Sequence, residues 1–338
     1  MKLTFKSFLK YFLLLALAAV LLWLAFRKVD WGEFWANLRS CNYWWILATM
    51  ALQAVVTLMR GNRWRIMMRP LSREISRHES YDAYAVCYLA NLALPRSGEV
   101  IRCGLIAGTR KATFEGALGT VVIERAWDLV CLVLAIVPLF FFGRFRDFLI
   151  EKMFLPAADS MQIGWFWLAA IIVAVLVAIF FILRAFRAKI AATKAGAALI
   201  RFWRGLVDGI KAGFRMERKW AFFGYTFLIW ISYWLCCLWT LYAFPGTESM
   251  TGLDALFLMA VGALGWVVPV QGGFGAYHFI VAMTLVPIYG FAESTALAFA
   301  TISHESQVVQ MLVCGLVAWA SWAICHRKNR KTQPIQQI

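Results

Sequence analysis

The sequence has few charged residues, and acidic residues are scarcer than basic ones. Only 15% of its 338 residues are charged, with 18 acidic residues against 34 basic ones, while 62% are hydrophobic. Apolar runs of about 18 residues or more are long enough to span a bilayer. Two of them are LKYFLLLALAAVLLWLAF (9–26) and GWFWLAAIIVAVLVAIFFIL (164–183). A soluble domain would not carry several such runs, so the sequence predicts a polytopic helical membrane protein.

The sequence also lacks the common signatures of enzymes. Its eight cysteines form no C-x-x-C pair, and neither G-x-S-x-G nor H-E-x-x-H occurs. The longest polar segment, 184–219, has the length of a single helix and is too short for a nucleotide- or tRNA-dependent catalytic domain. We therefore predict no cofactor, no catalytic residue and no metal site, and an enzyme acting on lipid phosphate is the least favoured class.

The net charge of +16 does not indicate nucleic acid, because the basic residues cluster between the apolar runs. The positive-inside bias and anionic headgroups explain that placement. It puts the segments 60–79 and 184–219 and both termini in the cytoplasm of a cell with an inner membrane. Full spans are predicted near 7–26, 43–59, 116–142, 164–183, 220–243 and 293–323. The segment 184–219 reads as a basic amphipathic helix on the cytoplasmic face, acting as a linker or recruiting lipid.

Two apolar stretches, 81–108 and 254–290, carry proline and glycine near their middle. Such residues end or kink helices, so each stretch is predicted to be a broken, re-entrant hairpin, with two closely spaced spans as the alternative. The expected fold is thus an all-α bundle of about six spans and two hairpins in one membrane domain, 1–338. The half 7–142 has the same order as 164–323, with opposite topology. Inverted repeats of this kind point to a transporter-like site near the midplane.

Charged side chains at membrane depth are costly and tend to mark function. The first group is Arg96, Glu99 and Arg102. A helix starting after Gly98 would place Glu99 and Arg102 on one face, and its N-terminus and the arginines suit a lipid phosphate. The alternative is that the arginines snorkel to the cytoplasmic interface.

Two further groups are candidates. Glu124, Arg125 and Asp128 lie within VVIERAWDLV, spaced for pairing on one helix, and a purely structural ion pair is the alternative. The third group is polar and lies in two neighbouring stretches: Gln271, His278, His304 and Glu305. These residues bind substrate or stabilise helix contacts; the spacing of the two histidines gives a metal site little support.

Three motifs carry a resemblance to a known family: LPRSGEVIR (94–102), E-R-x-x-D (124–128) and P-x-Q-G-G-F-G-A (269–276). In this order they resemble the lysylphosphatidylglycerol synthase membrane-domain family, also described as flippase-like, over nearly the whole chain. The turn and hinge positions of the pattern fall on Pro95, Gly98, Pro269, Gly272, Gly273 and Gly275. Where the family often has an acidic residue and an arginine, this chain has His278 and His304, which weakens a site for a cationic headgroup.

The resemblance implies a protein that moves lipid between leaflets, without the soluble aminoacyltransferase domain of the bifunctional members. The expected partner is a membrane lipid: an anionic or aminoacylated phospholipid, or a polyprenyl phosphate. A second copy of the chain and an enzyme of envelope biosynthesis are further candidate partners. The alternative function is an accessory protein that presents a lipid or polyprenyl phosphate to such an enzyme.

Overall fold

The computed structural model of the chain describes residues 5–148, 209, 211, 214–247 and 249–332. These residues belong to two compact units. The first unit combines residues 1–121 with 216–338, and the second comprises residues 122–215. The predicted span 164–183 and most of the predicted amphipathic helix 184–219 lie outside the described residues, so each unit is treated by itself below.

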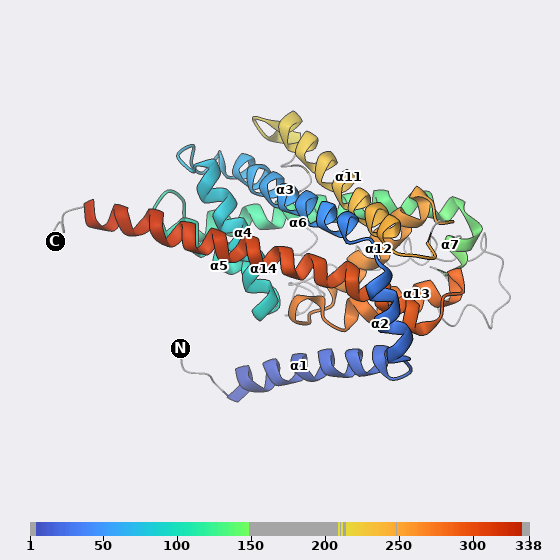
Figure 1. Cartoon of the computed structure of the whole chain (residues 1–338). Coiled ribbons are helices and arrows are strands. Elements are labelled where there is room, and N and C mark those ends of the chain that lie inside the picture. Colours follow the sequence, from blue (N-terminus) through green and yellow to red (C-terminus); the bar gives the residue numbers. More distant parts are fainter. Residues whose placement is uncertain (1–4, 149–208, 210, 212–213, 248, 333–338) are drawn as a thin grey trace, which may run out of the picture. The chain divides into compact units, whose positions relative to one another are not determined.

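All regular elements of the described residues are helices (Figure 1). In chain order they are α1 (Phe5–Phe26), α2 (Trp31–Ser40), α3 (Tyr43–Met68), α4 (Arg77–Ala93), α5 (Gly98–Gly108), α6 (Phe114–Ile136), the 3-10 helix η1 (Val137–Phe141), α7 (Gly143–Asp147), α11 (Lys219–Ala243), α12 (Gly252–Val267), the 3-10 turn η4 (Gln271–Gly273), α13 (Ala276–Tyr289) and α14 (Glu293–Thr332). The all-α prediction is confirmed.

Four helical segments in the described part are long and apolar enough to cross a membrane: Tyr43–Met68, Lys219–Ala243, Gln271–Tyr289 and Glu293–His326. Shorter apolar helices cover Leu13–Phe26 and Gly252–Val267. The chain is therefore a multi-pass helical membrane protein. The predicted spans 220–243 and 293–323 match α11 and the apolar part of α14 closely.

Two segments that the sequence placed between spans are helical. Asp30 caps α2 by accepting hydrogen bonds from the backbone N–H groups of Gly32 and Glu33, so the expected loop 27–42 contains a helix. The predicted span 43–59 is extended to Met68 in α3. The predicted span ends at residue 59 because Arg60 and the arginines that follow it are typical of a cytoplasmic loop. Arg60 and Arg63 instead lie buried within the helix.

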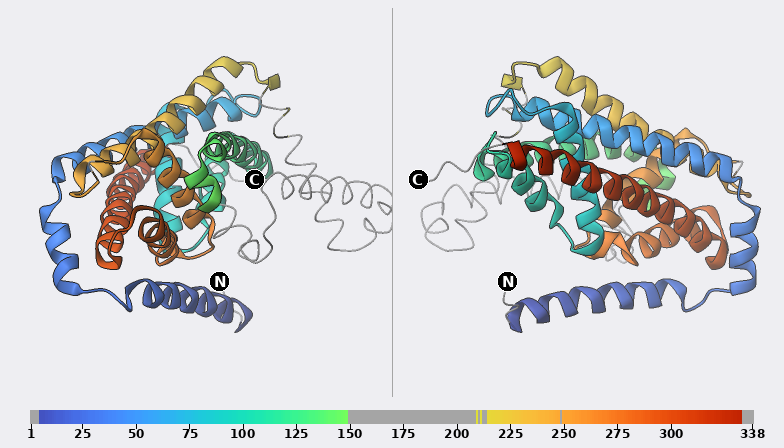
Figure 2. Two further views of the ribbon diagram at one scale, coloured as in Figure 1. Left: turned by 90° about the vertical axis from the view of Figure 1, so that its right-hand side faces the viewer. Right: turned by 60° about the vertical axis from the view of Figure 1, so that its left-hand side comes forward.

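The first unit is held together by close helix pairs. Helices α3 and α11 lie side by side in all views (Figures 1 and 2), and α14 packs against both α4 and α3. Small residues allow close approach in a membrane, where packing rather than water drives helix association. At Gly61 of α3 an added methyl carbon would lie 3.0 Å from the Cα of Tyr81 in α4. Likewise Ala296, Ala298 and Ala300 of α14 are buried in an apolar cluster with residues of α12 and α13.

A capping box and an ion pair fix the start of α4 to the segment after α5. The Ser76 hydroxyl accepts from the Glu79 backbone N–H, and the Glu79 carboxylate accepts from the Ser76 N–H. Lys111 Nζ donates to both Glu79 oxygens at 2.8 Å, and His326 Nε2 lies 3.7 Å away. Burial raises the pKa of Glu79, but the hydrogen bonds from Lys111 and Ser76 outweigh it, so the pKa is lowered overall.

We expect Glu79→Gln to lower the free energy of unfolding by about 1–2 kcal/mol near neutral pH. A lowered carboxyl pKa stabilises the fold fully above the pKa of the unfolded state, and this contribution is lost as the pH falls through the folded-state pKa. The deficit of the variant should therefore shrink in acid. Thermal unfolding in detergent, measured at neutral and acidic pH, tests this.

Lys28→Ala is the matched control, because the Lys28–Glu293 pair is 64% and 46% exposed and an exposed pair contributes within about 1 kcal/mol. A Glu79→Gln deficit that is the same at both pH values would contradict the assignment.

Candidate functional site

The first broken segment turns between α4 and α5 at residues 94–97. Arg96 has φ 58°, a left-handed conformation that is uncommon for a residue with a side chain. The new helix begins at Gly98, whose N–H donates to Asn91 Oδ1 at 2.8 Å. Gly98 is required by packing, since a Cβ there would lie 2.0 Å from the carbonyl oxygen of Cys87. The helix predicted to start after Gly98 is present and begins at Gly98 itself.

The second broken segment interrupts the chain between α12 and α13. Three glycines, Gly272, Gly273 and Gly275, have φ of 54°, 76° and 76°, which glycine adopts without steric cost. A Cβ on Gly275 would lie 2.8 Å from the carbonyl oxygen of Ala18, so the loop packs directly on α1. Proline and glycine break the segment where the sequence analysis placed the interruption.

The two interruptions meet in space. Arg96 Nη2 donates to the carbonyl oxygen of Val267, the last residue of α12, at 2.9 Å. Leu92, near the end of α4, lies so close to Gly272 that an added methyl carbon would be 3.0 Å from its Cδ2. Irregular backbone at membrane depth is tolerated where protein buries it or where it lines a cavity. The juxtaposition therefore joins two distant parts of the chain at one irregular junction.

Among the described residues of the first unit three arginines are buried: Arg60 and Arg63 on α3 and Arg102 on α5, here called the arginine cluster. The guanidinium of Arg102 lies over the rings of Trp64 and Tyr84, 4.7 and 4.5 Å from their centroids. Arg60 Nη1 donates to the Tyr84 hydroxyl at 2.9 Å. The aromatic rings thus hold the guanidinium groups of Arg60 and Arg102 by cation–π contact. Arg102 is fully buried within the protein.

The remaining first-group residues lie closer to the surface. Glu99 is partly buried and accepts from Asn91 Nδ2 at 3.4 Å, and Arg96 is exposed. The structure therefore separates the three predicted residues: Arg102 faces the interior, while Arg96 bridges the two broken segments.

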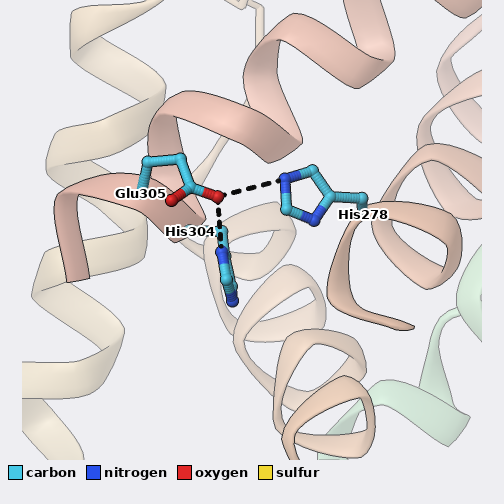
Figure 3. A group of neighbouring side chains, drawn as sticks. All are labelled: His278, His304 and Glu305. Carbon is cyan, nitrogen blue, oxygen red and sulfur yellow. Dashed lines mark hydrogen bonds and ion pairs between the residues drawn. The ribbon is translucent and has the colours of Figure 1, made fainter. Parts of the chain in front are cut away.

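The third predicted group gathers around the second interruption (Figure 3). His304 and Glu305 come from α14, and His278 comes from α13. Glu305 Oε1 lies 2.9 Å from His304 Nδ1 and 3.5 Å from His278 Nε2. His304 Nε2 lies 2.8 Å from the carbonyl oxygen of Gly272. Both imidazoles are buried, and Glu305 is 37% exposed. We call these three side chains the histidine–glutamate group.

Gln271 lies beside this group in sequence, and its Oε1 is buried without a hydrogen-bond partner among the described residues. The structure thus brings His278, His304 and Glu305 together and leaves Gln271 as a neighbour in the loop.

The second predicted group lies in the second unit, on the part of α6 beyond residue 121. Arg125 Nη1 is 3.6 Å from Asp128 Oδ2, and Nη2 is 3.9 Å from Glu124 Oε1. The Glu124 side chain is buried, whereas that of Arg125 is 47% exposed. The predicted i,i+3 pairing of Arg125 with Asp128 is present, and Trp127 packs against Phe214 at 5.2 Å.

Sequence reasoning missed Arg60 and Arg63. A signal was available, because apolar residues Trp64, Met67 and Met68 follow them at helical spacing. A helix that continues to Met68 places the arginines among these residues, and all three are buried.

Together, the fold and the buried ionisable groups define an integral membrane protein with charged and polar side chains buried among its helices. The family model of the lysylphosphatidylglycerol synthase TM region matches residues 11–315, and the chain belongs to this family. The resemblance seen in the sequence motifs is thereby confirmed, and it places the protein in a lipid-related membrane process. Comparisons with curated proteins and with solved structures gave no match.

Proposed function

We propose that this protein moves a phospholipid or a related phosphate-bearing amphiphile between the leaflets of the inner membrane. The observation that carries the proposal is the arginine cluster next to a broken membrane helix. A guanidinium has several N–H donors and binds phosphate in a bidentate manner. It can therefore accept a lipid phosphate while it keeps contacts with its protein neighbours. Cations buried at membrane depth are costly and are typical of substrate pathways.

The arrangement of elements supports a transporter-like mechanism. The order of a long helix, a broken pair and another long helix describes α3 to α6 and again α11 to α14. Interrupted helices that meet near the midplane are typical of transporters built from inverted repeats. We propose that the two halves rock around the junction between Arg96 and Val267 and expose the buried polar side chains to either leaflet in turn. In this proposal both termini and the basic segments lie in the cytoplasm, as the positive-inside bias predicts.

The remaining charged residues have supporting roles in this proposal. Glu99 orients Arg102 on α5 or meets a cationic headgroup. Within the second unit, Glu124 and Asp128 orient Arg125. The substrate is an anionic or aminoacylated phospholipid or a polyprenyl phosphate, since each offers the phosphate that the arginines recognise.

Reconstitution tests the proposal. Purified protein in phospholipid vesicles should speed the exchange of a fluorescent phosphatidylglycerol between leaflets, followed by quenching of the outer leaflet. Arg63→Gln should slow this exchange at least about tenfold, because a buried charge that contacts phosphate is lost. Arg73→Gln is the control, since Arg73 is 72% exposed.

The lipids that co-purify with the same proteins, identified by mass spectrometry, separate two outcomes. Wild type that enriches one phosphate-bearing lipid and exchanges it supports transport. Wild type that enriches the lipid but does not exchange it overturns transport in favour of a presenting role. Equal exchange by wild type and Arg63→Gln removes the arginine from the mechanism.

A further inference from the structure

The histidine–glutamate group places three metal-ligating atoms around one point (Figure 3). His278 Nε2, His304 Nδ1 and Glu305 Oε1 each offer a lone pair, and the potential ligand atoms all lie within 4.8 Å of one another. Two of the separations are 2.9 and 3.5 Å. A tetrahedral Zn²⁺ with bonds of about 2.0–2.1 Å holds its ligand atoms roughly 3.3 Å apart. The side chains are thus spaced for an ion with little rearrangement.

The two polar contacts of the His304 ring require a proton or a metal ion between Nδ1 and the Glu305 carboxylate. The Gly272 carbonyl can only accept, so Nε2 of His304 carries the hydrogen that faces it at 2.8 Å. Nδ1 then faces a carboxylate oxygen, also an acceptor, at 2.9 Å. Two lone pairs that approach this closely need a proton or a metal ion between them. A metal-ligating histidine typically donates its second ring N–H to a backbone carbonyl, as His304 does to Gly272.

His278 is also free to present its lone pair. Its Nδ1 is buried without a hydrogen-bond partner among the described residues. The proton of the neutral ring can therefore reside on Nδ1, which leaves Nε2 to bind an ion beside Glu305.

The surroundings hold the His304 ring in place. It stacks on Trp266 at 5.2 Å and meets Phe274 edge-on at 5.0 Å. Tyr277, whose ring lies 5.2 Å from that of His304, is itself held by a hydrogen bond of its hydroxyl to Ser303 at 2.9 Å. Ligands locked by packing favour a defined coordination geometry. His304 lies about 16 Å from the start of α14 at 1.5 Å per residue, inside the segment that is long and apolar enough to cross a membrane.

We propose that His278, His304 and Glu305 form a Zn²⁺ site inside the membrane domain. Two imidazoles and one carboxylate suit Zn²⁺, whereas Ca²⁺ and Mg²⁺ prefer oxygen ligands alone. Three protein ligands leave the fourth position for water or another oxygen donor, as in sites that act on a ligand. The partly exposed Glu305 carboxylate marks the side on which that position opens. The site does not depend on the lipid proposal, because it shares no residue with the arginine cluster.

Binding of Zn²⁺ to the full chain in detergent tests the site. After treatment with a chelator, wild type should bind one Zn²⁺ per chain in competition with a chromophoric chelator. His278→Ala, His304→Ala and Glu305→Gln should each weaken binding at least about 100-fold, since loss of even an outer-shell partner costs 10–100-fold. Co²⁺ in place of Zn²⁺ should give the visible absorption of a four-coordinate ion in wild type.

The other two histidines of the chain, His78 and His326, supply matched controls. The double variant His78→Ala/His326→Ala should bind Zn²⁺ as wild type does. Glu305→Gln keeps the shape of the side chain. If this variant, without metal, unfolds at the same temperature as wild type, its weaker Zn²⁺ binding is not caused by misfolding.

Wild type that binds no Zn²⁺ overturns the site and leaves a proton between His304 and Glu305. Zn²⁺ binding that survives Glu305→Gln and His304→Ala also overturns it. An Arg63→Gln variant inactive in lipid exchange should still bind Zn²⁺.

Discussion

Gly98→Ala is expected to destabilise the protein by about 3 kcal/mol or more, although it adds a single methyl group. The new carbon would lie 2.0 Å from the Cys87 carbonyl oxygen and 2.8 Å from the Cys87 sulfur. Neither backbone can give way without separating α4 from α5, and overpacking of this kind costs about 1–3 kcal/mol and occasionally more. The hydrogen bond from Gly98 to Asn91 would be strained as well. Thermal unfolding in detergent measures the effect.

Gly104→Ala is the control on the same helix. Nothing lies within 4 Å of a Cβ at Gly104, and alanine is about 1 kcal/mol better than glycine in a helix interior. This variant should be as stable as wild type or more stable. If the two variants unfold at the same temperature, the close approach of α4 and α5 is not present in solution.

Arg102→Ala is expected to cost about 3 kcal/mol in stability and to abolish lipid exchange. The guanidinium is buried against the rings of Trp64 and Tyr84, and a desolvated cation–π contact contributes about 2 kcal/mol or more. Truncation also leaves a cavity beside the two rings, which adds to the loss. Unfolding and vesicle exchange, measured on the same preparation, give both numbers.

Arg102→Lys separates the two effects. Lysine keeps the charge but loses the planar stacking and the bidentate phosphate contact. We expect it to recover part of the stability and little of the exchange. Arg73→Ala, at an exposed arginine, should change stability by no more than about 0.5 kcal/mol. Full exchange by Arg102→Lys would assign Arg102 a role as a charge alone.

The helices were largely predictable, because long apolar runs need only backbone hydrogen bonds within the run to form a span. The span predicted at 220–243 begins one residue later than α11. The prediction was wrong at the end of α3, where three arginines followed an apolar run and were assigned to a cytoplasmic loop. The charge of these arginines, taken without tertiary contacts, favours a loop outside the membrane. What keeps Arg60 inside is Tyr84, which lies on another helix and is not visible from local sequence.

The residues of the candidate site were also predictable from the sequence, but their grouping in space was not. Local chemistry identified the residues: charges at membrane depth, and proline with glycine at the interruptions. Their grouping depends on tertiary packing. His278 and His304 are separated by a helix and a turn, and only the packing of α13 on α14 places their nitrogens on either side of Glu305.

The bond between Arg96 and the Val267 carbonyl sets an energy scale for motion. Any movement that parts the two interruptions must break it, and a hydrogen bond from a charged group contributes about 1.5–3 kcal/mol. Two conformations of one protein typically differ by a few kcal/mol, so this one contact is large enough to decide which of them dominates at rest. A substrate that parts the two interruptions must then prefer the open form by roughly 10- to 150-fold. Selectivity would in that case come from how strongly a lipid distinguishes the two conformations, rather than from how tightly it binds.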